Sequence, residues 1–199
     1  MYIDESLKKY IDDLSDKIPA PGGGSAAALS GALGVALLSM VLHYTIGKEK
    51  YKRFENQLMQ ALQSVKELKH QFSRLIDEDV QVYKKVSETF QSQDGTIKEK
   101  SLKDAATVPI EICNHSYEAL KLAESILKKS NINLLSDIGV AAELLAAAYN
   151  SALFNVHINL KSIKDKEFTS HIIEAMNPQR AEIEKIKKTI IDFVNKTLQ

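Results

Sequence analysis

The hydrophobic pattern of this 199-residue chain is dominated by one run without a formal charge, from Ser25 to Gly47. Alanine, glycine and serine are spread among its leucines and valines, so a helix over 25–46 would be apolar or small on every face. Such a helix has to be surrounded by other parts of the protein. The preceding Pro19–Gly24 contains two prolines and three glycines, which cannot propagate a helix, and Ser25 is a favoured N-cap residue. We therefore predict a buried central helix that Ser25 caps and Gly47 ends.

The rest of the chain also has helical periodicity. The clearest stretch is 51–91, where apolar side chains recur at alternating spacings of four and three residues. The other helices are predicted over 2–15, 97–129, from a cap at Ser136 or Asp137 to about Lys161, and over 166–176 and 178–197. Pro109 is expected to kink or restart its helix, and Asn177 and Pro178 are expected to begin the last one. The pattern predicts an all-α, single-domain helical bundle over 1–199, with a buried small-residue central helix.

Two charged residues interrupt the apolar stripe of the predicted helix 51–91. Lys69 can carry its charge to solvent on a long stem, whereas Asp79 cannot, because its side chain is short. A carboxylate on an apolar stripe needs a hydrogen-bond partner, a water molecule or a ligand. A helix–helix hydrogen bond and a functional role are both open for Asp79.

Other polar groups are candidates for ligand binding. The start of the central helix leaves backbone N–H groups available to an anion or polar ligand at Gly22, Gly23, Gly24 and Ser25. The alternative is that these residues only form an N-cap with a flexible lead-in. Asn155 and Asn159 lie one turn apart on a line of small residues, where they can hydrogen-bond either a ligand or a neighbouring helix.

Composition excludes several classes of function. Lys plus Arg and Asp plus Glu number 26 each, so there is no excess positive charge for nucleic acid. The single cysteine, Cys113, excludes an intrachain disulfide and a cysteine-pair metal site. The five histidines show no metal-binding spacing. We therefore expect neither a metal ion nor a cofactor.

The apolar run 26–46 is about long enough to cross a bilayer, so a membrane protein is an alternative. Its many small residues lower its hydrophobicity, and no second uncharged run of comparable length is present. The first ten residues are charged and amphipathic, unlike a signal peptide. We expect a cytoplasmic protein without a membrane partner.

Several stretches, taken together, resemble the formimidoyltetrahydrofolate cyclodeaminase and methenyltetrahydrofolate cyclohydrolase family. The resemblance spans nearly the whole chain in order, at Pro19–Ser25, Tyr44–Lys48, Ile76–Val80, Ala106–Pro109, Ser136–Ala142 and Asn155–Leu160. It implies an all-helical bundle that forms a homodimer. Proteins of this family occur alone in bacteria or fused behind a formiminotransferase, which is absent from this sequence.

The resemblance also implies a chemistry. In the cyclohydrolase reaction water opens the ring of 5,10-methenyltetrahydrofolate, and in the cyclodeaminase reaction 5-formimidoyltetrahydrofolate closes its ring and releases ammonia. Both reactions need proton transfer and stabilisation of a delocalised cation, which suits carboxylates whose pKa is raised by burial. We predict that Asp137 is the acid and base, that Asp79 stabilises the cation or shares that role, and that one cleft holds both together with Ser25.

The remaining candidates would bind the folate substrate. Asn155 and Asn159 would hydrogen-bond the pterin edge, and Gly22–Ser25 would hold a polar part of the molecule. An alternative from a different class is a non-catalytic helical dimer that binds folate or a protein partner and uses these polar residues for packing.

Overall fold

The computed structural model describes residues 1–89 and 94–199, and over these residues it contains helices and no strand. The elements are η1 (Tyr2–Asp4), α1 (Leu7–Ser15), α2 (Gly23–His43), η2 (Glu49–Phe54), α3 (Glu55–Thr89), α4 (Gly95–Ile126), η3 (Ile132–Leu134), α5 (Leu135–Ser162) and α6 (Lys166–Leu198). The predicted all-helical fold is confirmed. Phe90 and Gln91, which we placed at the end of the predicted helix 51–91, lie outside the described residues.

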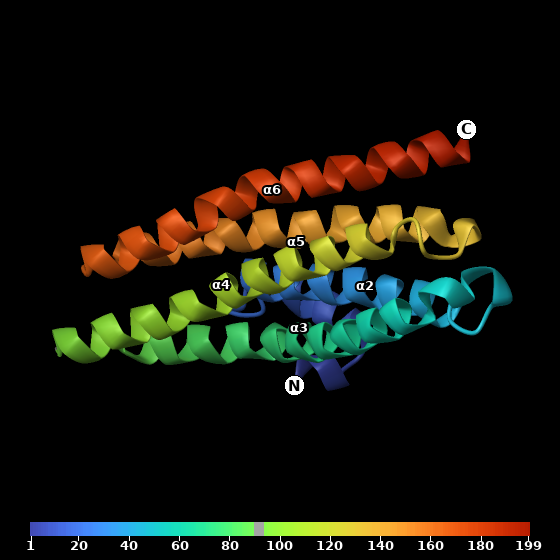
Figure 1. Ribbon diagram of the computed structural model, residues 1–199. Coiled ribbons are helices and arrows are strands. Elements are labelled where there is room, and N and C mark those ends of the chain that lie inside the picture. The colour runs from blue at the N-terminus through green and yellow to red at the C-terminus, as the bar shows by residue number, and fades with distance from the viewer. Residues whose placement is uncertain (90–93) are drawn as a thin grey trace.

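The long helices form a bundle around α2. Helix α2 packs against α3 and α5, α4 closes the bundle against the same two helices, and α6 runs along α4 and α5 (Figure 1). The side of α2 that faces the bundle is fully buried, for example at Val35 and Leu38. The opposite side is not covered within one chain, because Leu33 is 51% exposed. The small-residue helix is therefore central in the packing but uncovered on one face.

Two glycines let the neighbouring helices approach α2 closely. A Cβ atom at Gly31 would lie 2.2 Å from Phe72 Cε1 of α3, and one at Gly34 would lie 2.7 Å from Leu145 Cγ of α5. Neither distance leaves room for a methyl group. The glycines of α2 are therefore required by packing against large apolar side chains.

We expect Gly31→Ala to lower the free energy of unfolding by about 1–3 kcal/mol, because the ring of Phe72 has to move. Gly139→Ala is the matched control: its Cβ would lie 3.5 Å from Val194, at ordinary contact distance in another buried helical position. That variant should be neutral or more stable, because alanine favours a helix over glycine. Urea midpoints of both variants test this, and equal destabilisation would contradict the packing argument.

Several predicted helix ends are wrong. Helix α2 begins at Gly23 with Gly22 as its N-cap, so Ser25 lies inside the first turn and is not the cap. The helix ends at His43, shortly before the predicted end at Ile46, and Gly47 follows as predicted. Gly47 has a φ of 81°, a conformation that glycine adopts readily. At the N-terminus of the chain, the predicted helix 2–15 is divided into η1 and α1, and the Ser6 side chain caps α1.

The predicted break before Pro178 is also wrong, because α6 is continuous through it. Pro178 lies on the exposed side, so the carbonyl of Glu174 that loses its amide partner can bond to water. On the buried side, the Tyr149 hydroxyl of α5 donates to the carbonyl oxygen of Met176 at 3.2 Å and holds α6 in place. Likewise Pro109 lies within a continuous α4.

Two segments are long and apolar enough, by length and composition alone, to cross a membrane. They are α2, with mean hydropathy 2.0, and 132–162, with mean hydropathy 1.4. The absence of charged residues points only to the first, because the second contains Asp137 and Glu143. Half of each is buried inside the bundle, as core helices of soluble proteins also are.

Candidate active site

The first turn of α2 binds a carboxylate from α3. The backbone N–H of Ser25 donates to Asp79 Oδ2 at 2.9 Å. A Cβ at Gly24 would lie 2.0 Å from Asp79 Oδ1, so only glycine permits this approach. Asp79 therefore occupies the positive end of α2, where the sequence predicted an anion.

Burial of Asp79 raises the pKa of its carboxyl group, and the hydrogen bond from the Ser25 N–H opposes this effect. The helix–helix hydrogen bond that we considered for this residue is thus present. A carboxyl group whose pKa is shifted toward neutrality can also both accept and donate a proton. Both roles therefore remain compatible with the geometry.

The hydroxyl group of Ser25 has a structural role. It donates to the carbonyl oxygen of Ile76 at 2.8 Å and accepts a hydrogen bond from the Tyr10 hydroxyl at 3.1 Å. Ser25 is fully buried. Its hydroxyl group therefore already has hydrogen-bond partners within the protein. In the first turn of α2, the groups left for a ligand are the backbone atoms of Gly22 and Gly23.

Sequence reasoning missed Tyr10 and Asp77, which hold the N-terminal segment on this site. Tyr10 is 5% exposed although it lies on the otherwise exposed α1. Asp77 is 6% exposed and accepts from the backbone N–H groups of Tyr2 at 2.5 Å and Ile3 at 3.3 Å. No local signal marks Asp77, because its partners are about 75 residues away in the sequence.

The two asparagines of α5 differ in their surroundings. Asn159 Nδ2 donates to the carbonyl oxygen of Ala105 in α4 at 3.1 Å, which is the interhelical bond that we considered. Asn155 Nδ2 donates to Ser151 within α5 at 3.0 Å, and a Cβ at Gly23 would lie 3.6 Å from the same nitrogen. Asn155 therefore lies beside the start of α2.

The structure does not bring Asp137 to this site within one chain. It lies in the first turn of α5, whose N-cap is Leu134 without a side-chain cap bond, so the predicted capping by Ser136 or Asp137 is wrong. Asn155 is 18 residues further along the same helix, which corresponds to about 27 Å. Within one subunit, the predicted cleft therefore does not hold Asp137 together with Asp79 and Ser25.

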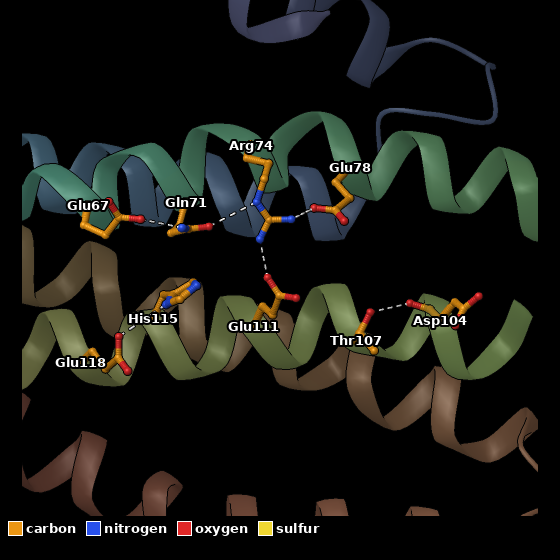
Figure 2. Close-up of polar contacts among 9 residues, drawn as sticks. All are labelled: Glu67, Gln71, Arg74, Glu78, Asp104, Thr107, Glu111, His115 and Glu118. Atoms are coloured by element: carbon orange, nitrogen blue, oxygen red, sulfur yellow. Dashed lines mark hydrogen bonds and ion pairs between the residues drawn. The ribbon is translucent and has the colours of Figure 1, made fainter. Parts of the chain in front are cut away.

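A large cleft lies elsewhere, between α3, α4 and α6, with a volume of about 1040 Å³. Figure 2 shows Glu67, Gln71, His115 and Glu118 of its α3 and α4 walls. Outside the cleft lining, Arg74 of α3 pairs with Glu78 and with Glu111 of α4. The carboxylates of the cleft itself, Glu67 and Glu118, are exposed. We assign the candidate active site to the start of α2, because among the described residues Asp79 alone is a carboxylate of raised pKa that a helix N-terminus holds.

Within residues 1–89 and 94–199, no group of three or more His, Cys, Asp or Glu side chains is placed to hold a metal ion. Cys113 is fully buried, and burial raises the pKa of its thiol, so it is not poised as a nucleophile.

Comparisons with known proteins identify the family. The family model described as formiminotransferase-cyclodeaminase matches residues 6–178. The chain belongs to this family. It is 35% identical to a methenyltetrahydrofolate cyclohydrolase from Methylorubrum extorquens, over 96% of this chain and 98% of that protein.

Two further relatives show the range of this family. A solved structure of a formiminotetrahydrofolate cyclodeaminase from Thermotoga maritima matches with a TM-score of 0.95 and 27% identity, covering all of both chains. A formimidoyltransferase-cyclodeaminase from Mus musculus is 29% identical over 87% of this chain. The chain spans about a third of that protein (34%), so it corresponds to one part of the longer relative.

Proposed function

We propose that this chain is an enzyme of folate one-carbon chemistry that acts on the carbon–nitrogen bonds of 5,10-methenyl- or 5-formimidoyltetrahydrofolate. The observation that carries the proposal is Asp79, a carboxylate with a raised pKa at the first turn of α2 and on the side of the bundle where Asn155 also lies. The full-length similarity to a cyclohydrolase supports the hydrolytic reaction. The full-length structural similarity to a cyclodeaminase supports the deamination as a second candidate.

In the hydrolytic reaction, ionised Asp79 takes a proton from water as the water oxygen bonds to the carbon between N5 and N10. The carboxylate also stabilises the cation of the methenyl group while this bond forms. Protonated Asp79 then returns the proton to N5 as the C–N5 bond breaks, which leaves the formyl group on N10. The hydroxyl group on this carbon loses its remaining proton to solvent as its C=O bond forms, so the positive charge of the methenyl cation leaves as that proton.

In the deamination, the protonated form of Asp79 is the starting state. N10 bonds to the formimidoyl carbon, and the proton of N10 passes to the formimidoyl nitrogen. Asp79 donates a second proton to this nitrogen, the C–N bond breaks and ammonia leaves, so that a methenyl cation forms beside the carboxylate. The raised pKa of Asp79 increases the share of its protonated form at a given pH, which favours this starting state. We propose that Asn155 and the backbone of Gly22 and Gly23 bind the polar edge of the folate, while Asn159 holds α4 in place.

The test is to incubate the purified chain with each folate separately and to follow the absorbance of the methenyl form. Loss of methenyl absorbance faster than in buffer supports the hydrolase, and its appearance from 5-formimidoyltetrahydrofolate supports the deaminase. Binding without conversion of either folate would contradict an enzyme and favour a non-catalytic folate-binding dimer.

We propose that the reaction requires no metal ion or other cofactor, because proton transfer and charge stabilisation are within the capacity of Asp79. The expected result is an unchanged rate in excess EDTA after dialysis against the chelator. Loss of activity that a divalent metal restores would overturn this proposal.

We propose that two copies pair through the outer side of α5, which presents a stripe of exposed apolar and small residues. Val140, Phe154 and Ile158 are 51%, 74% and 60% exposed, with Ala147 and Ser151 exposed between them. Exposed apolar side chains in a continuous patch are typical of an interaction surface. A second copy over this α5 stripe also removes the surface that a membrane would cover, and we propose that the dimer is cytoplasmic.

This pairing gives Asp137 a place near the site. The stripe is centred near residue 149, so in a two-fold pairing of antiparallel α5 helices the partner's Asp137 faces residue 161. That position is about 9 Å along the helix from Asn155. We propose that the partner's Asp137 completes the site as a second acid and base.

Mixing two inactive variants tests this arrangement. We expect Asp79→Asn and Asp137→Asn each to be inactive, and an equal mixture after subunit exchange to regain about a quarter of the wild-type rate, because random pairing leaves one site in four intact. Sedimentation shows the oligomeric state. A monomer would contradict the pairing, and a dimer without recovery, or an active Asp137→Asn variant, would contradict the role of Asp137.

A further inference from the structure

A second, smaller cleft lies at the other end of the bundle and has no part in the proposed reaction. It has a volume of about 260 Å³ and is formed by η2, the connection between α4 and η3, the first residue of α5 and the last turns of α6. Leu135 in its wall is 20 residues from Asn155 along α5, which corresponds to about 30 Å. A ligand here would therefore not touch the site at the start of α2.

The charged residues that line this cleft all have one sign. Lys50, Arg53 and Lys128 line it, and its lining includes no acidic residue. Among the described residues, these three form no ion pair. Each lies against an aromatic ring instead: Lys50 Nζ is 5.6 Å from the Tyr51 ring centre, Arg53 Cζ is 4.5 Å from that of Phe54, and Lys128 Nζ is 5.6 Å from that of Phe193. In a chain of zero net charge this is a local concentration of positive charge.

An unsatisfied hydroxyl group provides independent evidence for a ligand. Ser130 is 4% exposed and lines the cleft, and its Oγ atom has no hydrogen-bond partner in the described protein. The polar groups next to it are satisfied: the N–H of Asn131 donates to Thr45 Oγ1 at 3.0 Å, and the N–H of Ile132 donates to the Tyr51 hydroxyl at 3.1 Å. Buried hydroxyl groups are almost always hydrogen-bonded, so Ser130 lacks a partner that a ligand can supply.

We propose that this cleft binds a small organic anion with a phosphate or carboxylate group on an apolar body. The three cations and the Ser130 hydroxyl would hold the anionic group, since charge-assisted hydrogen bonds are the stronger kind. Leu127, Leu135 and Phe193 in the wall would contact the apolar body. The proposal does not depend on folate activity.

The experiment is a titration of the full chain, followed by NMR of the backbone amides of 50–54 and 128–132. The probes are phenyl phosphate and benzoate, with inorganic phosphate and benzyl alcohol as probes that lack the body or the charge. Saturable binding of phenyl phosphate or benzoate at these amides supports the proposal, and the tighter of the two identifies the anionic group. Equal binding of inorganic phosphate or benzyl alcohol, or no binding of either anion, would overturn it.

Variants test the named residues. Arg53→Gln, or Lys128→Gln if the first does not fold, should weaken binding about tenfold or more, as expected for loss of one charge-assisted contact. Lys52→Gln is the matched control, because Lys52 lies next to Arg53 but pairs with Glu49 and does not line the cleft. An equal loss in this control would indicate general attraction between charges and would contradict a site.

Ser130→Ala separates binding from folding. We expect this variant to bind the anion more weakly while its melting temperature without ligand is equal to or above that of the wild type, because no internal hydrogen bond is lost. A lower melting temperature would mean that Ser130 has a partner within the protein, and unchanged affinity would mean that it does not contact the ligand. Either result would contradict the assignment.

Discussion

Replacement of Asp79 by asparagine is expected to lower turnover by about two to four orders of magnitude, the usual contribution of an acid–base group. The shape of the side chain is kept, and its amide oxygen can still accept from the Ser25 N–H, so the fold should persist. The control is Glu88→Gln, which removes an exposed carboxylate from the same helix. Turnover near that of the wild type would leave Asp79 with a purely structural role.

Asp79→Asn should also change how the stability of the protein depends on pH. Because the pKa of Asp79 is raised in the folded state, the folded protein holds its proton more tightly than the unfolded chain does. The stabilisation that this tighter proton binding gives is fully present when the pH is below the ordinary pKa of a carboxyl group. It is lost as the pH rises through the raised pKa of Asp79. Wild type should therefore lose stability relative to Asp79→Asn with increasing pH, as measured by urea midpoints. The opposite trend would contradict the burial of this carboxylate.

Gly24→Ala is expected to lower turnover about a hundredfold, the size of loss that a 1 Å misplacement of a catalytic group can cause. Its Cβ would lie 2.0 Å from Asp79 Oδ1 and 2.6 Å from Cγ, so the carboxylate has to leave its place on the Ser25 N–H. We also expect a loss of about 1–3 kcal/mol in the free energy of unfolding.

Gly95→Ala is the control for this prediction. Gly95 lies in the first turn of another long helix, α4, has no part in the proposed site, and a Cβ there would meet nothing within 4 Å. Steady-state kinetics and urea unfolding of both variants should therefore show damage only at Gly24. Equal damage at Gly95 would contradict the importance of the close approach to Asp79, and full activity of Gly24→Ala would separate Asp79 from the reacting atoms.

The sequence revealed Asp79 because a short carboxylate on a periodic apolar stripe conflicts with packing and so demands a partner. It did not reveal that partner, because the Ser25 N–H is 54 residues away in the chain. The prediction of Ser25 as an N-cap rests on the N-cap propensity of serine alone. In the structure its buried hydroxyl group accepts a hydrogen bond from Tyr10 and donates one to the carbonyl oxygen of Ile76. Local preference gives way to tertiary contacts at this position.

Helix identity followed from periodicity, but helix ends and distances did not. The Pro178 signal for a new helix was overridden because Met176 and Ile183 keep α6 packed on the bundle. Asp137 and Asn155 both lie on α5, where their separation in residues corresponds to about 27 Å, so a site within one subunit does not include both. Counting the rise along a predicted helix would have excluded that combination within one subunit from the sequence alone.

The packing of α2 between α3 and α5 also has a consequence for synthesis on the ribosome. The Ser30 hydroxyl of α2 donates to the carbonyl oxygen of Leu144 in α5, 114 residues later. At ordinary elongation speeds α2 is made on the order of ten seconds before the helix that buries one side of it. During that interval an uncharged helix is exposed to solvent. Nascent chains stalled before α5 should therefore be bound by chaperones that recognise apolar segments, and chains completed through α5 should be released from them.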